Sequence, residues 1–116
     1  MEQLICHLIG DYMLQTNWMA RHKHEKFGIA VVHAFTYLLP FVLITQSLPA
    51  LAIIFGTHTL IDHFRLARYV IRLRNWCWTD TGFPTETPSH IAQAISIVVD
   101  NTIHLLINFL AIKYWG

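Results

Sequence analysis

The sequence predicts an all-α fold, a four-helix transmembrane bundle with up-down topology, and two observations lead to this prediction. The first is composition, because 54% of the residues are hydrophobic and 13% are charged, whereas a soluble domain has about 25% charged residues. The second is charge distribution: Phe27 to Ile61 contains no Asp, Glu, Lys or Arg, and Thr87 to Ile112 contains only Asp100. Since one span needs about 20 mostly apolar residues, the first window is long enough for two spans and the second for one.

A small, very apolar soluble bundle is the alternative, but the chain lacks the polar positions that such a surface needs. Its 116 residues suffice for one domain, 1–116. The first residues show no basic region followed by a cleavage site, so we expect no signal peptide. A net charge of +1 provides no broad basic surface and argues against nucleic acid as a partner.

The first helix is expected over about residues 3–20, and its marginal length suits either a full or a re-entrant span. A basic turn leads to the second helix, about 28–45, in which Pro40 predicts a kink. A short polar turn follows, and Pro49 suits the first turn of the third helix, about 48–74.

The third helix loses its apolar character after Ile61. Arg65, Arg68 and Arg72 share one helical face beyond that point, which predicts a basic extension at the membrane interface. Gly, Thr and Pro residues in 75–88 predict a loop. The fourth helix is expected over about 88–114, with Thr87 as its cap and Pro88 at its first position.

Basic residues predict the orientation of the bundle. Most Lys and Arg lie in the first and third connections, which an up-down bundle places on one face (Arg21, Lys23, Lys26, Arg65, Arg68, Arg72 and Arg74). The positive-inside rule makes that face cytoplasmic and puts both termini on the non-cytoplasmic side of a bacterial inner membrane. A bundle this small would gain stability by pairing as a homo-oligomer, although no helix carries a GxxxG motif.

Polar side chains recur at four-residue spacing inside these apolar helices, and residues at this spacing share one helical face. They form a stripe on the first, third and fourth helices, and a single histidine marks the second (His7, Asp11, Gln15; His58, Asp62; Asp100, His104, Asn108; His33). An Asp at the centre of a span costs about 2.5–3.5 kcal/mol. These groups must therefore converge on one another, on a cation or on water.

We predict that they bind one or two divalent metal ions, and Zn, Mn or Fe suit imidazole and carboxylate ligands. The predicted ligands are His7, Asp11, His33, His58, Asp62, Asp100 and His104. The predicted catalytic groups are the carboxylates of Asp11, Asp62 and Asp100, and Arg65 would hold a substrate phosphate. Gln15 and Asn108 would orient the ligands by hydrogen bonds. His63 is a weaker ligand candidate, whereas His22, His24 and His90 are expected to be solvated.

The N-terminal stretch "HLIGDYMLQTNWMARHK" (7–23), together with the His-rich second helix and "HTLIDHFR" (58–65), resembles a family of small bacterial and phage membrane proteins known as domain of unknown function 3307. This resemblance covers most of the chain and implies no activity. The chain is more loosely similar to membrane-bound hydrolases that depend on a metal held by intramembrane His and Asp. With the site residues, that similarity implies a metal-dependent hydrolase of a phosphorylated lipid or similar amphiphile. No HExxH signature is present, which argues against a peptidase.

Three alternatives to a metal-dependent hydrolase are open. In a transport protein they would relay protons or cations, and in a purely structural role they would hold the helices together by His–Asp hydrogen bonds. In a phage accessory protein that modulates a host membrane complex, the loop 75–90 would be the contact surface. A water path to both membrane faces would indicate transport, whereas an enzyme needs access from one side.

Overall fold

The computed structural model describes all 116 residues as an all-α fold without strands. Its six α-helices are α1 (Glu2–Leu8), α2 (Asn17–His22), α3 (Phe27–Leu38), α4 (Leu48–Phe64), α5 (Ala67–Asn75) and α6 (Ser89–Trp115). A π-helical segment, η1 (Ile9–Met13), follows α1, and a 3₁₀ segment, η2 (Leu39–Leu43), follows α3. The all-α prediction is confirmed, but the helices differ in number and length from the four that were predicted.

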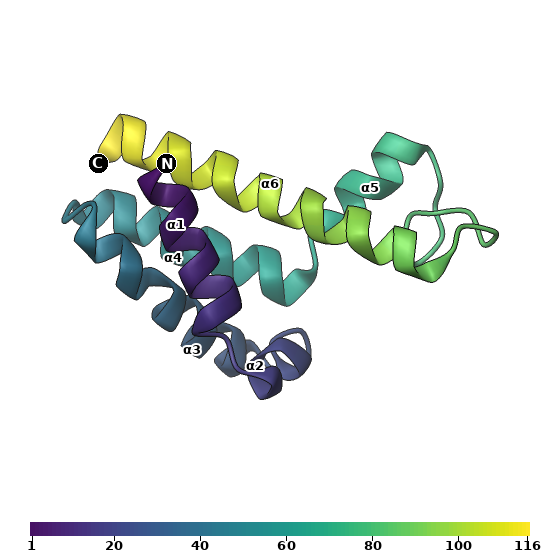
Figure 1. Cartoon of the computed structure of the whole chain (residues 1–116), viewed down its shortest axis with the longest axis horizontal. Coiled ribbons are helices and arrows are strands. Elements are labelled where there is room, and N and C mark those ends of the chain that lie inside the picture. The colour runs from purple at the N-terminus through teal and green to yellow at the C-terminus, as the bar shows by residue number, and fades with distance from the viewer.

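The three longest helices form the body of the molecule. α3 packs on α4, α4 packs on α6, and α1 contacts α6, so that both termini lie at the same end (Figure 1). At the opposite end α5 packs on the first turns of α6 through a small cluster of Ile71, Phe83 and Ala92. A second apolar cluster lies nearer the termini (Cys6, Tyr37, Phe41, Ile54 and Ala111). The polar stripes therefore lie between two apolar clusters.

The first predicted helix, 3–20, is interrupted, which corrects the prediction of a first span. α1 passes into the wide turns of η1 at Ile9, yet His7 Nε2 still lies 3.6 Å from Asp11 Oδ2, one turn further along. The helix then stops, and the Thr16 hydroxyl caps α2 by accepting a hydrogen bond from the Met19 N–H. α1 and η1 together are shorter than the roughly 17–25 residues that a span requires.

Proline and serine shape the next connection as the sequence predicts. α3 gives way to η2 at Pro40, whose ring lacks the N–H that an α-helical ladder needs. Ser47 then caps α4 by accepting a hydrogen bond from the Ala50 N–H, and Pro49 lies in the first turn of α4. The expected interruption and the expected helix start are both confirmed.

The third predicted helix, 48–74, is in fact two helices. α4 ends at Phe64, Arg65 adopts a left-handed backbone with φ of 52°, and α5 begins at Ala67. A left-handed conformation costs a non-glycine residue about 1–2 kcal/mol, and the burial of Ile71 against Phe83 offsets that cost. Arg65 consequently lies in a turn and not on the helical face that carries the site residues of α4.

The fourth predicted helix, 88–114, corresponds to α6, although no side chain caps it and Pro88 precedes its first residue. The predicted Thr87 cap is therefore wrong. With 27 residues, α6 is the one helix long and apolar enough to cross a membrane by itself, and 17% of its most apolar window is buried. The apolar segments Phe27–Leu43 and Leu48–Phe64 are shorter. Helix length thus leaves the prediction of a four-span up-down bundle without support.

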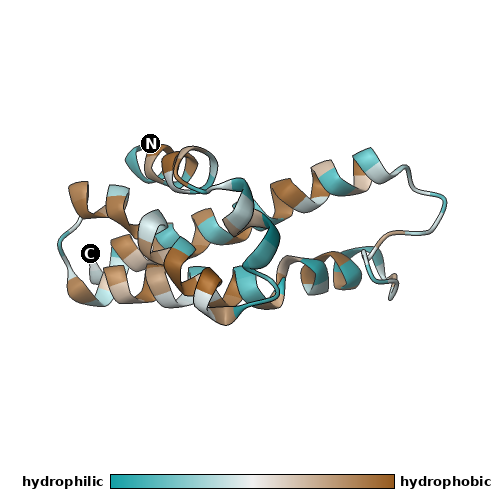
Figure 2. Ribbon diagram, turned by 90° about the horizontal axis from the view of Figure 1, so that it is seen from below, coloured by the Kyte–Doolittle hydropathy of each residue, from teal (hydrophilic) through white to brown (hydrophobic).

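The distribution of polar and apolar side chains between interior and surface differs from that of an ordinary soluble fold. Eight of the 25 buried residues are polar or charged, whereas large apolar side chains such as Phe35, Val98 and Leu106 are more than half exposed. Figure 2 shows long hydrophobic stretches along the helices near the termini and more hydrophilic residues toward the other end. Monomeric soluble proteins rarely expose apolar surface on this scale.

Gly10 allows α1 and η1 to approach α3 closely. A Cβ atom at this position would lie 2.5 Å from Cδ2 and 3.1 Å from Cα of Tyr37. We expect Gly10→Ala to lower the free energy of unfolding by about 1–3 kcal/mol, as overpacking does in cores. Denaturant titration in detergent measures this change. Gly56→Ala is the matched control, because nothing lies within 4 Å of its new Cβ, and a loss as large as that of Gly10→Ala would contradict the close-approach argument.

Candidate metal centre

Six of the predicted ligands converge from four separate segments of the chain. They are Asp11 from η1, His33 from α3, His58 and Asp62 from α4, and Asp100 and His104 from α6. The pairs on α4 and α6 each lie one turn apart, so the helix itself places both side chains on one face. All of these residues except Asp100 are buried, and the Asp100 side chain is 34% exposed.

Four ligand atoms form a compact first group: Asp11 Oδ1, His33 Nε2, His58 Nε2 and Asp62 Oδ2. The two histidine nitrogens lie 2.9 Å apart. His33 Nε2 lies 3.1 Å from the Asp11 oxygen and 3.2 Å from the Asp62 oxygen. The corresponding distances from His58 Nε2 are 3.5 Å and 3.1 Å.

These five separations, 2.9–3.5 Å, lie near the donor spacing of a four-coordinate metal site. Ligands bound at about 2.0–2.1 Å in a tetrahedron lie about 3.3–3.4 Å from one another. The donor set of two imidazole nitrogens and two carboxylate oxygens suits Zn, Mn or Fe. The first group is therefore a His/Asp cluster that could bind a divalent metal ion.

A second group shares Asp62 with the first and adds Asp100 and His104. His104 Nε2 lies 3.2 Å from Asp62 Oδ1 and 3.5 Å from Asp100 Oδ2. Three protein ligands leave an open position at a metal site, as catalytic zinc sites do. This group is the more exposed of the two because Asp100 reaches solvent.

His7 lies beside the two groups but belongs to neither. Its Nδ1 lies 2.7 Å from the Tyr37 hydroxyl, and its Nε2 lies 3.0 Å from the Asn101 Oδ1. Burial lowers the pKa of His7, which favours a neutral ring. In that state Nε2–H donates to Asn101 and Nδ1 accepts from Tyr37, so both nitrogens are satisfied.

The two residues expected to orient ligands make indirect contacts. The Asn108 amide donates to the Tyr37 hydroxyl at 2.7 Å. Gln15 accepts a hydrogen bond from Lys23 Nζ at 2.9 Å and donates to the Asp11 backbone carbonyl at 3.2 Å. Both residues therefore contact neighbours of the predicted ligands, while every ligand and catalytic role stays a prediction.

Sequence reasoning missed two residues of the basic turn, Lys23 and His24. Lys23 Nζ donates to Asp62 Oδ2 at 2.8 Å, and only 12% of its side chain is exposed. His24 was expected to be solvated, yet its Nδ1 lies 2.6 Å from the backbone carbonyl of Asp62. Burial lowers the pKa of His24, so a neutral ring donates to this carbonyl. A turn without periodicity gave no signal of this packing.

Tyr37 and His63 are two further ring side chains near the ligand groups. Tyr37 stacks on His58 with ring centroids 3.7 Å apart and planes at 9°, which fixes the orientation of the imidazole. His63 Nδ1 lies 3.0 Å from the Lys23 backbone carbonyl, and His63 belongs to neither group. The Tyr37 contact could not be found from helical spacing because it joins α3 to α4.

Asp11 is ionised in this setting. Burial raises the pKa of its carboxyl, but the hydrogen bond from His33 favours the charged form, and the pKa lies below its ordinary value. A carboxylate that is charged in a buried position is a ready metal ligand.

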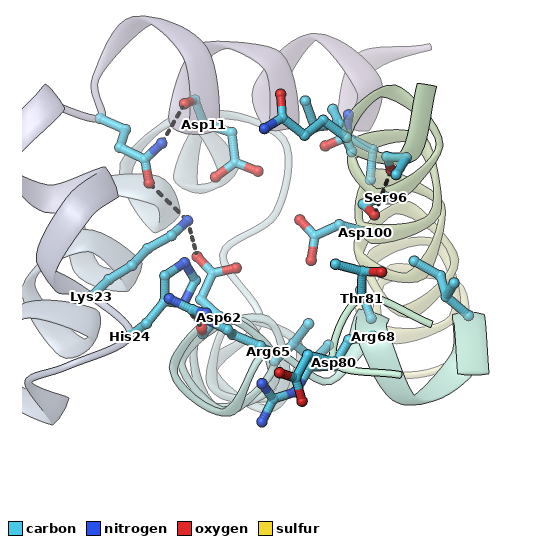
Figure 3. Close-up of a pocket in the computed structure, with 18 of the residues that line it drawn as sticks. Asp11, Lys23, His24, Asp62, Arg65, Arg68, Asp80, Thr81, Ser96 and Asp100 are labelled. Atoms are coloured by element: carbon cyan, nitrogen blue, oxygen red, sulfur yellow. Dashed lines mark hydrogen bonds and ion pairs between the residues drawn. The ribbon is translucent and has the colours of Figure 1, made fainter. Parts of the chain in front are cut away.

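A cavity of about 970 Å³ adjoins both groups. Figure 3 shows the carboxylates of Asp11, Asp62 and Asp100 pointing toward a common space, with Lys23 hydrogen bonded to Asp62. The predicted phosphate ligand Arg65 lines the same cavity, together with Arg68 of α5 and Gln93 and Ser96 of α6. Acidic groups and basic groups thus face one solvent-accessible space.

Comparison with known proteins gives a family match and nothing further. The family model described as "Protein of unknown function (DUF3307)" matches residues 1–115. No curated protein and no solved structure matches the chain. The looser similarity to membrane-bound hydrolases stays a prediction.

Proposed function

This chain belongs to the DUF3307 family, and we propose that it is a membrane protein whose His/Asp centre binds a divalent metal and hydrolyses the phosphate ester of an amphiphile. One observation carries the proposal. A group of four His/Asp donor atoms, all within 4.8 Å of one another, adjoins a cavity that is also lined by basic side chains. Metal ligands and phosphate-binding groups around one space are what metal-assisted phosphate hydrolysis requires.

The many exposed apolar side chains support a membrane environment. α6 is long enough to cross a bilayer, and the 17-residue segments Phe27–Leu43 and Leu48–Phe64 fall at the lower end of the roughly 17–25 residues used by spans. The outer faces of α3, α4 and α6 carry exposed Val32, Leu60 and Leu106, respectively. Because Lys23, Arg65 and Arg68 line the cavity, the positive-inside rule puts its mouth on the cytoplasmic side.

In the proposed reaction water adds to the phosphorus atom, and the bond from phosphorus to the amphiphile's oxygen breaks. Asp100 accepts a proton from the water and passes it to the leaving oxygen, so the products are inorganic phosphate and the free alcohol. Arg65 and Arg68 neutralise the phosphate oxygens. A divalent ion held by the His/Asp centre would lower the pKa of water there to about 7 and so would supply a nucleophile at neutral pH.

Phosphate release from phosphatidic acid in detergent micelles tests the proposal. Purified protein with Mn²⁺ or Zn²⁺ is expected to release inorganic phosphate, and excess EDTA is expected to stop the release. Asp100→Asn is expected to slow the reaction by about 100- to 10,000-fold, the usual contribution of a general acid–base group.

Asp80→Asn is the matched control, since Asp80 lines the same cavity but belongs to neither ligand group. It is expected to keep most of the activity. Equal rates for wild type and Asp100→Asn, or release that persists in EDTA, would contradict the proposed chemistry. Glycerol phosphate, which has no acyl chains, is expected to react more slowly because it does not partition to the membrane surface.

A row of imidazoles favours proton relay as the second candidate function. His58 Nε2 lies 2.9 Å from His33 Nε2, and His58 Nδ1 lies 3.2 Å from His104 Nδ1. A relay across the membrane also needs a path to the opposite face. The apolar cluster around Phe41 and Ile54 lies in that direction, so access from one side, and therefore an enzyme, is the better-supported function.

A further inference from the structure

Asp62 is the residue that the two ligand groups share, and its two oxygens face different partners. Oδ2 lies 3.2 Å from His33 Nε2 and 3.1 Å from His58 Nε2, within the first group. Oδ1 lies 3.2 Å from His104 Nε2, within the second group. One carboxylate therefore joins the two groups through separate atoms.

The two groups differ in completeness and in access to solvent. The first has four protein donors, and its histidines are at most 1% exposed. Its carboxylates, Asp11 and Asp62, line the cavity but are only 10% and 3% exposed, against 34% for Asp100. The second has three protein donors, and Asp100 lines the cavity. Closed four-donor sites are typical of structural metals, whereas sites with an open position are typical of catalytic metals.

Lys23 does not block this arrangement. Its ammonium donates to Asp62 Oδ2 at 2.8 Å, but a carboxylate oxygen has two lone pairs and can accept a hydrogen bond while it binds a metal. Lys23 also contacts Gln15, so its position at the cavity wall is fixed independently of Asp62.

We propose that the centre is dinuclear and asymmetric, with Asp62 as the bridging ligand. The inner metal position is bounded by Asp11, His33, His58 and Asp62 and has four protein donors. The outer position is bounded by Asp62, Asp100 and His104 and opens to the cavity, where it takes the phosphate group of the substrate. Two-metal sites of phosphatases hold their ions about 3.5–4 Å apart, a spacing that one bridging carboxylate accommodates. This inference rests on the metal binding of the proposed function and assigns its reacting position.

Titration of the detergent-purified protein with Mn²⁺ tests the inference. Wild type is expected to bind two equivalents and to show the electron paramagnetic resonance signal of an exchange-coupled Mn²⁺ pair. Asp100→Asn and His104→Gln are each expected to retain one equivalent with the signal of an isolated Mn²⁺ ion. Two variants of the outer position are used because His104 is buried and its substitution can disturb folding. Asp100 is partly exposed, so its substitution is compatible with folding.

His90→Gln and Asp80→Asn are the controls, since both residues are exposed and lie outside the groups, and both variants are expected to bind two equivalents. Wild type that saturates at one equivalent, or Asp100→Asn that retains a coupled pair, overturns the inference. One equivalent together with phosphate release would leave the hydrolase proposal intact. A coupled Mn²⁺ pair without phosphate release would support the dinuclear centre and remove the hydrolase proposal.

Discussion

Asp62→Asn is expected to abolish tight metal binding and hydrolysis together. Asp62 contributes an oxygen to each ligand group, and an amide replaces its charged bidentate carboxylate by one neutral oxygen. Changes to residues that merely orient ligands cost about 10–100-fold in metal affinity, so the loss of a shared ligand is expected to exceed that range. Elemental analysis and phosphate release are the two measurements.

The same substitution also leaves Lys23 without its buried partner. Removing one member of a buried ion pair costs about 3–5 kcal/mol, so unfolding alone is a second cause of metal loss in this variant. The double variant Asp62→Asn, Lys23→Met separates these effects, because it removes both charges. It is expected to regain stability in denaturant titration without regaining metal. Full metal occupancy in a folded Asp62→Asn protein would exclude Asp62 as a ligand.

The convergence of ligands was predictable because regular helices fix it locally. His58 and Asp62 lie one turn apart on α4, and Asp100 and His104 lie one turn apart on α6. The cost of burying carboxylates in an apolar helix requires these pairs to face one another. The sequence therefore identified the helical faces of the centre, and the structure shows that they meet.

Local backbone departures limited the rest of the prediction. The π turns of η1 carry Asp11 toward His33 while His7 pairs with Tyr37 and Asn101, and no periodic pattern encodes such a turn. Arg65 leaves the helical face through a left-handed backbone that only tertiary packing selects. Lys23 was assigned only to a basic turn, because its contact with Asp62 spans 39 positions in the chain.

Helix length does not support four membrane spans, whereas the apolar outer surface favours a membrane environment. The two observations differ for a physical reason. Hydropathy windows count residues along the chain, so they join α3 to η2 and α4 to α5, although a proline and a left-handed residue interrupt those segments. Surface composition counts what faces outward, and it remains apolar on α3, α4 and α6. Exposure is the more direct guide, because lipid contacts the outer face of a helix whatever its length.

A comparison of two exposed leucines decides between membrane and aqueous surroundings. Leu106 lies on α6 with 56% exposure, and Leu73 lies on α5 with 62% exposure. In water, arginine at either position would change stability by less than about 0.5 kcal/mol. In a bilayer, arginine near the middle of a span costs about 2.5–3.5 kcal/mol, whereas arginine is tolerated on α5, which the proposed orientation places at the membrane interface.

We therefore expect wild type and Leu73→Arg to stay in the membrane pellet after a urea wash, and Leu106→Arg to be depleted from it. Val98→Arg, at a position 63% exposed on the same helix, is expected to repeat the effect of Leu106→Arg. Equal recovery of all variants would show that the outer face of α6 is not in lipid. The cavity would then face water, and nothing would favour an amphiphile over a soluble phosphate ester as the substrate. The proposal of a metal centre does not depend on the membrane and is tested separately by metal binding.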